Sequence, residues 1–191
     1  EVVEVPASDG SLMLAVSPST PLPSTIPSDA ASVDYTTFAF TAVGDDIAVN
    51  GLTLWRDGLG SEDDFSEIWL SIDGFKVGSE RSINSDQNAV LTLSRDYIVV
   101  PSGETVLVDL KASMGTSVGA NRTNRLGLRS AADVDTNAVQ VSGTFPMYGN
   151  YMTTSSYSVG NARFNNDGSA TTVDVGDVQT VIGEFEGENE S

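Results

Sequence analysis

Short runs of alternating apolar and polar residues cover most of the chain, and turn-forming residues separate them. Residues 33–43 place Phe38 and Phe40 on one face, and residues 105–111 alternate in the same way. This period of two predicts β-strands with one buried face. Further strands are predicted at residues 11–17, 47–55, 89–93, 97–100 and 125–129. No segment shows a clear 3.6-residue period, so no helix is predicted.

The densest pattern lies between Gly58 and Gly78, where an acidic loop leads into a strand and a tight turn. Residues 65–72 carry apolar residues at both odd and even positions, which predicts a central strand covered on both faces. Asp73-Gly74 stands between apolar neighbours and predicts a two-residue β-hairpin. We therefore expect this segment to organise the fold.

Regular short strands separated by turns favour an all-β fold, and specifically an immunoglobulin-like Greek-key β-sandwich with extended terminal strands. Four prolines within residues 18–27 predict an extended crossing there, because Pro has no N–H for a strand ladder. The sandwich is expected at residues 10–136. An extended N-terminal strand is expected at residues 1–9, and a β-rich C-terminal extension at residues 137–191.

The C-terminal extension contains a faint internal repeat. Residues 178–185 (Val-Gln-Thr-Val-Ile-Gly-Glu-Phe) have the Val-to-Phe spacing of residues 33–40, and residues 157–164 form a further candidate strand. The repeat indicates the first strand of a partial second domain or a strand-exchange segment, with chance similarity as the alternative.

Residues 1–5 alternate acidic and apolar side chains and form a second orphan strand, at the other end of the chain. An unpaired strand is covered when it joins the sheet of another chain, and such contacts from end to end build open filaments. The residues expected to make this contact are Val2, Val3, Val5, Val178, Val181 and Phe185.

Charge and residue types exclude several classes of function. The net charge is -18, from 27 acidic and 9 basic residues, so the chain should repel nucleic acid and anionic membrane surfaces. It has no Cys and no His, which excludes disulfides, zinc sites and Ser-His-Asp or Cys-His catalysis. No apolar run is long enough to span a bilayer, and the first residues lack the features of a signal peptide. We predict no catalytic residue and no enzymatic activity.

Clustered acidic side chains in loops are suited to calcium, which prefers several oxygen ligands. None of the clusters fits the EF-hand pattern, and for each one alone a solvated turn is an equally good interpretation. We expect calcium to bind at one or more of them. The candidate ligands are Asp57, Glu62, Asp63, Asp64, Asp133, Asp135, Asn137, Asn165, Asp167, Asp174 and Asp177.

Other side chains support weaker hypotheses. Paired carboxylates such as Asp63 with Asp64 could serve glycoside hydrolysis, but no other signal supports this chemistry. The aromatic residues Tyr148, Tyr151 and Tyr157 could stack on sugars, which would make the chain a carbohydrate-binding module; filling a core or an interface is their structural alternative. N-glycosylation acceptor patterns occur at Asn121 and Asn189.

Three stretches of strand and turn residues carry a family resemblance: residues 10–21 (Gly-Ser-Leu-Met-Leu-Ala-Val-Ser-Pro-Ser-Thr-Pro), 58–70 (Gly-Leu-Gly-Ser-Glu-Asp-Asp-Phe-Ser-Glu-Ile-Trp-Leu) and 100–105 (Val-Pro-Ser-Gly-Glu-Thr). They resemble the repeated immunoglobulin-like domains of large bacterial surface and pilus-like proteins. Residues 143–150 look like the segment that joins one such repeat to the next. The resemblance covers residues 10–150 and begins again near Val173. It implies an extracellular structural β-domain, and it bears on fold more than on activity.

Together these patterns predict an extracellular or cell-surface structural subunit. Its expected partners are copies of itself, joined head to tail through strand exchange and stabilised by calcium. The alternative is a calcium-dependent carbohydrate-binding or adhesin module, with glycans as partners. Contact with nucleic acid and membrane insertion are not expected.

Overall fold

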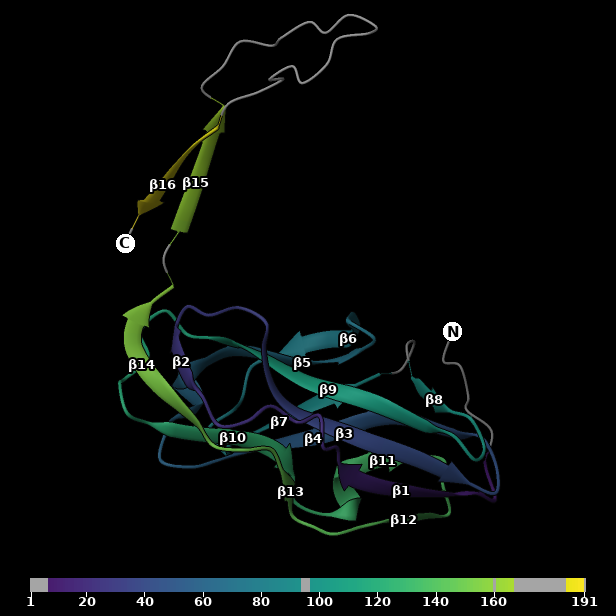
Figure 1. Cartoon of the computed structure of the whole chain (residues 1–191). Helices are drawn as coiled ribbons and strands as arrows, with labels where there is room; N and C mark the ends of the chain where they lie inside the picture. Colours follow the sequence, from purple (N-terminus) through teal and green to yellow (C-terminus); the bar gives the residue numbers. More distant parts are fainter. Residues whose placement is uncertain (1–6, 94–96, 160, 167–184, 191) are drawn as a thin grey trace, which may run out of the picture. The chain divides into compact units, whose positions relative to one another are not determined.

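The computed structural model describes residues 7–93, 97–159, 161–166 and 185–190. The chain divides into two compact units, Glu1–Ser158 and Val159–Ser191. The described residues form strands and two short 3-10 turns, which confirms the all-β prediction (Figure 1). Among these residues there is no helix of the length and hydropathy needed to cross a bilayer.

Six strands of the first unit form one sheet, called here the first sheet. Its neighbouring strands run antiparallel except for β1 and β12, which are parallel. In spatial order the strands are β12 (Gln140–Gly143), β1 (Ser11–Val16), β3 (Val33–Val43), β9 (Thr105–Met114), β5 (Phe65–Ile72) and β6 (Phe75–Arg81).

The second sheet is built around one long strand, β4 (Ile47–Asp57). The strands that pair directly with it are β7 (Asn88–Thr92), β8 (Ile98–Val100), β10 (Thr123–Leu128) and β11 (Val134–Thr136). Beyond β10 the sheet continues with β13 (Met147–Tyr148), β14 (Met152–Ser158) and β2 (Thr25–Ser28).

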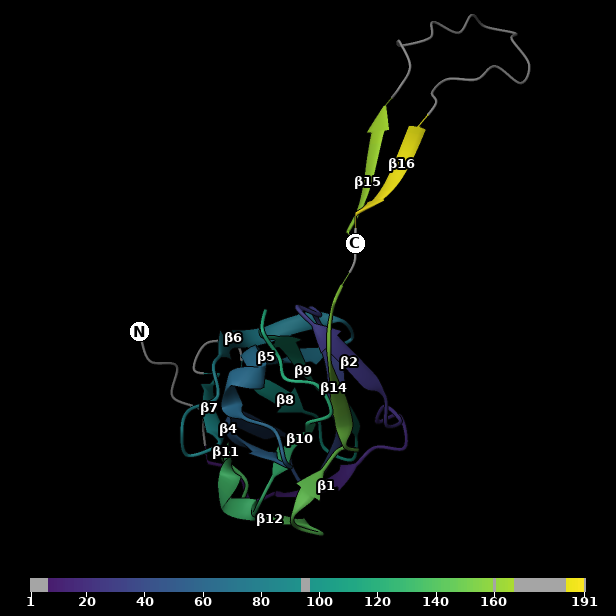
Figure 2. The ribbon, with the colours of Figure 1, turned by 90° about the vertical axis from the view of Figure 1, so that its left-hand side faces the viewer.

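The two sheets form a β-sandwich around a single core, because alternate residues of each strand point inward. Phe38 and Phe40 of β3 enter this core from the first sheet, and Leu52 and Leu54 of β4 enter it from the second. All four are essentially inaccessible to solvent. Figure 2 shows the strands of both sheets around this common interior.

The segment after the acidic loop has the predicted structure. In β5, Ile68 and Leu70 belong to the core, while Trp69 and Ser71 are buried on the outer face, so both faces of the strand are covered. The β5–β6 turn has φ 51° at Asp73 and 82° at Gly74. Positive φ at both central residues is the type I′ conformation that an Asp-Gly hairpin favours.

The compact sandwich unit runs to Ser158, rather than to the residue 136 expected from the sequence. The added part is held by strand ladders: β12 pairs with β1, and β14 pairs with β10 and β2. The proline-rich crossing ends in β2, a short strand at the sheet edge, where Pro27 is tolerated. The candidate strand at residues 157–164 is wrong, because β14 ends at Ser158 and a separate strand begins at Asn161.

The second unit is described by its own two strands, β15 (Asn161–Asn166) and β16 (Phe185–Glu190), which pair antiparallel. Several residues singled out in the sequence lie outside the described part of the chain: Val2, Val3, Val5, Asp167, Asp174, Asp177, Val178 and Val181.

Candidate functional site

The acidic loop after β4 is a short capped turn. The 3-10 turn η1 (Glu62–Asp64) begins after Ser61, whose hydroxyl accepts a hydrogen bond from the N–H of Asp63 at 3.3 Å. The Asp64 carboxylate returns the contact by accepting from the N–H of Ser61 at 3.0 Å. This reciprocal pair is a capping box, which satisfies backbone donors that the turn itself leaves open.

Asp64 is 1% exposed, and both of its carboxylate oxygens accept hydrogen bonds from distant side chains. Arg122 donates to Oδ1 at 2.8 Å, and Asn124 donates to Oδ2 at 2.9 Å. Asn124 is itself buried and accepts from Arg56 at 2.7 Å. The loop can approach this closely because residue 60 is a glycine. A Cβ at Gly60 would lie 2.3 Å from the Asn124 amide and 2.4 Å from the Asp64 carboxylate, which is too close for any side chain. The network joins the loop to β10.

Asp57, at the other end of the loop, lies on the surface. Its Oδ2 atom accepts from Arg125 Nε at 2.8 Å, from Arg125 Nη2 at 2.7 Å and from the Tyr151 hydroxyl at 2.9 Å. Partial burial acts to raise the pKa of Asp57, but the hydrogen bonds from Arg125 and Tyr151 together with the Arg125 charge hold it below its ordinary value. The same contact to Asp57 raises the pKa of Tyr151.

The predicted calcium ligands of this loop therefore point to different partners. Glu62 accepts from Gln87 at 2.7 Å, which lowers the pKa of Glu62, and Asp63 is exposed. In the part of the chain that the structure describes, no group of three or more Asp, Glu, His or Cys side chains is arranged around a common metal position. Asp63 and Asp64 also do not act as a pair, since Asp64 is buried in its own network.

The second acidic cluster is divided in a similar way. Asp133 accepts from the N–H groups of Arg129 and Ser130 at 2.8 and 2.7 Å, and its other oxygen accepts from the Trp55 indole at 3.1 Å. Asn137 accepts from the N–H of Ala48 at 2.8 Å. The exposed Asp135 lines a shallow cavity of about 80 Å³ together with Asp133. Asn165 lies in β15.

The outer face of the second sheet carries a set of stacked side chains that we call the arginine–aromatic face: Trp55, Arg125, Arg129, Tyr148 and Tyr151. The Arg125 guanidinium carbon lies 4.6 Å from the Tyr148 ring centre and 4.4 Å from the Tyr151 ring centre. That of Arg129 lies 3.7 Å from the centre of the Trp55 ring. Such cation–π contacts fix the positions of long, otherwise mobile side chains. The sequence pointed to Tyr148 and Tyr151, but it did not indicate their arginine partners.

One residue without a side chain makes this stacking possible. Gly127 lies between Trp55 of β4 and Tyr148 of β13 in the sheet. A Cβ at Gly127 would come within 1.9 Å of the Met147 carbonyl and 2.7 Å of the Tyr148 ring. The alternation of Arg125, Gly127 and Arg129 was visible in the sequence and could have indicated that these residues share one outer face of the sheet.

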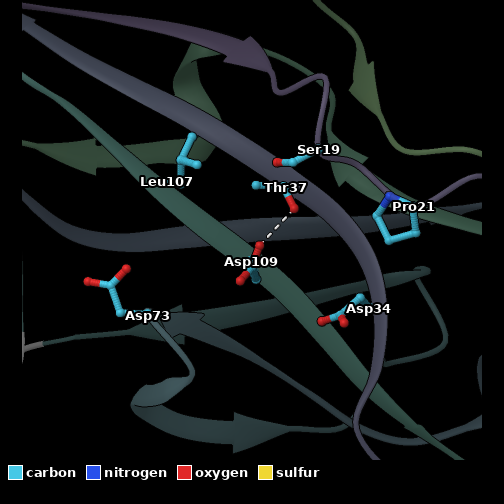
Figure 3. A pocket seen from close by; sticks show the side chains of 7 residues that line it. All are labelled: Ser19, Pro21, Asp34, Thr37, Asp73, Leu107 and Asp109. Carbon is cyan, nitrogen blue, oxygen red and sulfur yellow. Dashed lines mark hydrogen bonds between the residues drawn. The ribbon is translucent and has the colours of Figure 1, made fainter.

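The outer face of the first sheet has a hollow of about 300 Å³, called here the acidic pocket. Figure 3 shows its lining residues: Ser19, Pro21, Asp34, Thr37, Asp73, Leu107 and Asp109. The Thr37 hydroxyl donates to Asp109 at 2.7 Å, and Lys111 forms an ion pair with Asp34. Among the described residues, Asp73 has no ion-pair partner.

The remaining sequence candidates are surface residues. Asn121 is exposed in the loop before β10 and has φ 60°, and Tyr157 is 81% exposed. Asn189 lies in β16. Exposure of Asn121 is compatible with a glycosylation acceptor, and glycosylation of either Asn stays a prediction.

Comparisons with known proteins add little to this description. No protein-family model matches the chain, and no curated protein matches it. A solved structure described by the words "AvmM Catalyzes Macrocyclization in Alchivemycin A Biosynthesis" is similar over 74% of this chain and 85% of that chain. The sequence identity is 9% and the TM-score is 0.31. A similarity at this level supports no conclusion about activity.

Proposed function

We propose that the chain is an extracellular or cell-surface structural subunit with an immunoglobulin-like sandwich, and that its copies polymerise head to tail through strand exchange. The two facing sheets of mainly antiparallel strands support the immunoglobulin-like assignment. The resemblance to repeat domains of bacterial surface and pilus-like proteins supports the structural role. The observation that carries the proposal is the strand pair of the second unit.

This pair has the same pairing pattern as β1 and β3 in the sandwich. β1 pairs with β3 over six residues, with Val16 opposite Phe38. β15 pairs with β16 over six residues, with Asn166 opposite Phe185. In both pairs, the last residue of the first strand stands opposite a Phe at the start of the paired segment. In this register Phe185 corresponds to Phe38. The sequence spacing had aligned Phe185 with Phe40, which lies two residues further along β3.

The two pairs differ in their neighbours. In the sandwich, β1 is also bonded to β12, and β3 is also bonded to β9. Within the described residues, β15 and β16 form a sheet of only two strands. An isolated two-stranded sheet is marginally stable in water, so further strands would stabilise it. A strand from another copy would supply the missing backbone hydrogen bonds, and the alternating residues 1–5 have the pattern of such a strand.

Electron microscopy and light scattering of the full chain test this proposal. Polymers are expected for the unmodified chain, and deletion of residues 1–6 or the double substitution Val3→Asp/Val5→Asp should abolish them. Glu4→Gln is the matched control, because it changes the same segment without removing its apolar residues, and it should leave polymers intact. Polymers of unchanged length after the deletion would exclude strand exchange through residues 1–5.

A carbohydrate-binding or adhesin module is the second candidate, and the arginine–aromatic face is the observation that favours it. Tyr151 is 41% exposed beside Tyr148, and exposed aromatic rings on a sheet face can stack on sugars. This function predicts a monomer that binds glycans on an array and loses that binding in Tyr151→Ala. A calcium contribution is part of both candidates, with the ion held on the exposed side of the acidic loop.

A further inference from the structure

The two outer faces of the sandwich carry complementary groups. The arginine–aromatic face lies on the second sheet, and the acidic pocket lies on the first. Core residues alternate with these positions: in β9, Val108 and Leu110 point inward, which places Leu107 and Asp109 of the pocket outward. In β10, Leu126 and Leu128 point inward, which places Arg125 outward. The two surfaces are therefore on opposite sides of one sandwich.

The arginine–aromatic face has the composition of a protein-binding surface. Trp, Tyr and Arg are the residue types that most often carry the binding energy of protein interfaces. Their presence on one face is notable in a chain with 9 basic and 27 acidic residues. A partner for this face should offer carboxylates.

Arg129 is the group on this face that is free to meet such a partner. It is exposed, and no ion pair with a carboxylate is formed by it within the described part of the chain. Its guanidinium stacks on Trp55, whose indole N–H is fixed by Asp133. Arg129 is thus held in position before it binds, which lowers the entropy cost of ordering it in an interface.

The acidic pocket contains carboxylates with which Arg129 could form an ion pair. Among the described residues the Asp73 carboxylate has no ion-pair partner, and Thr37 donates to one Asp109 oxygen, which leaves the second Asp109 oxygen available to a docked group. Directly beside Asp109 in the sheet, the Ser71 hydroxyl is 1% exposed and has no hydrogen-bond partner among the described residues. A guanidinium presents several N–H donors in a plane, which suits two carboxylates placed together.

We infer that Arg129 of one copy docks into the acidic pocket of a second copy, with Asp73 and Asp109 as its carboxylate partners. Because the two surfaces belong to different faces, the contact is heterologous: each copy of a bound pair uses one surface and keeps the other. The pair therefore offers one free surface of each kind, so copies stack in an open row. The contact goes beyond strand exchange, since it joins sandwich faces and requires neither residues 1–6 nor the second unit.

Sedimentation equilibrium of the full chain at low salt tests this contact. The Val3→Asp/Val5→Asp background is used, because it removes strand exchange and leaves both faces unchanged. Arg129→Glu alone, and Asp73→Asn/Asp109→Asn alone, should each weaken self-association at least about tenfold. The Asn substitutions retain side-chain shape, and Asn is also well suited to the left-handed conformation at residue 73. Arg81→Glu and Asp86→Asn, at exposed positions outside both surfaces, are the matched controls.

Mixing the two defective variants gives the decisive result. The Asp73→Asn/Asp109→Asn variant still carries Arg129, and the Arg129→Glu variant still carries an intact pocket. The mixture should therefore form a dimer with the affinity of the unmodified contact, and 0.5 M salt should weaken it. A mixture that stays monomeric, or single variants that associate as tightly as the controls, would overturn the inference.

The result of these sedimentation experiments does not depend on strand exchange. Filaments that depend on residues 1–6, together with unaffected Arg129→Glu sedimentation, would support strand exchange alone. Binding of an acidic oligosaccharide that is lost in Arg129→Glu, without self-association of the unmodified faces, would assign this face to a glycan and overturn the contact between copies.

Discussion

Asp57 and Asp64 lie at the two ends of one acidic loop, and the structure places them in opposite environments. Each pairs with an arginine near the start of β10: Asp57 with Arg125 at 2.7 Å, and Asp64 with Arg122 at 2.8 Å. The side chain of Asp57 is 41% exposed, whereas that of Asp64 is 1% exposed. Two ion pairs whose lengths differ by only 0.1 Å thus differ mainly in their access to water.

Access to water decides how much each pair matters. An exposed pair gains little, because water and salt screen the charges, and its typical value is about 0–1 kcal/mol. Removing one member of a buried pair costs about 3–5 kcal/mol, since buried polar partners are left unsatisfied. At Asp64 the partner Arg122 is 44% exposed and can regain water, but Asn124 is fully buried and cannot. The structural importance of the loop is therefore concentrated at its buried end.

The largest expected effect is that of Asp64→Ala. It removes the acceptor of Asn124, the partner of Arg122 and the capping contact to Ser61, so we expect a loss of about 3 kcal/mol in the free energy of unfolding. Urea denaturation followed by tryptophan fluorescence measures it. Asp63→Ala is the matched control, an exposed neighbour expected to change stability by about 0.5 kcal/mol or less. Equal stability of the two variants would show that burial does not make Asp64 more important than its exposed neighbour.

The strands and the central hairpin could be predicted because their signals are local. Alternation places Phe38 and Phe40 on one face whatever the rest of the chain does, and Asp73-Gly74 favours its turn by itself. For Asp64 the local signal extends only to its capping contact with Ser61, which the Ser-x-x-Asp spacing indicates. Its partners Arg122 and Asn124 lie about 60 residues away, and only the pairing of β4 with β10 brings them to the loop.

The end of the sandwich was missed for a related reason. Residues 137–158 are rich in loop-forming residues, and β12 and β13 are four and two residues long. Such short strands are formed through ladders to β1 and β10, not through the propensity of their own residues. The pairing of Arg125 with two tyrosines was likewise beyond sequence reasoning, because it depends on the register of β10 against β13.

A smaller effect is expected from calcium, and it too depends on which carboxylates of the loop are open to water. A cation at Asp64 would have to displace Arg122 or Asn124, so calcium should bind only on the exposed side, near Glu62 and Asp63. With millimolar calcium and a dissociation constant of about 0.1–1 mM, the expected stabilisation is about 1 kcal/mol, or roughly 2–4 °C in Tm.

Differential scanning calorimetry with calcium and with a chelator measures this shift. Asp63→Asn should remove it, and Asp86→Asn, an exposed control in another turn, should retain it. The same Tm with calcium and with chelator would rule out a stabilising calcium site in the unmodified chain.

The smallest effect is expected at Asp57. Asp57→Ala should cost less than about 1 kcal/mol, because its pair with Arg125 is exposed to water and salt.

The pKa of Asp57 is lowered in the folded state, so its contribution is present above the ordinary aspartate pKa and is lost as pH falls through the lowered value. The stability difference between the unmodified chain and Asp57→Ala should therefore be constant at neutral pH and vanish in acid. Urea unfolding at a series of pH values measures it, and a difference that grows as the pH falls would contradict the assigned ion pair. Asp57→Asn separates charge from shape, since it retains an acceptor for Arg125 and Tyr151 but has no carboxylate. Its stability relative to Asp57→Ala should therefore not change with pH.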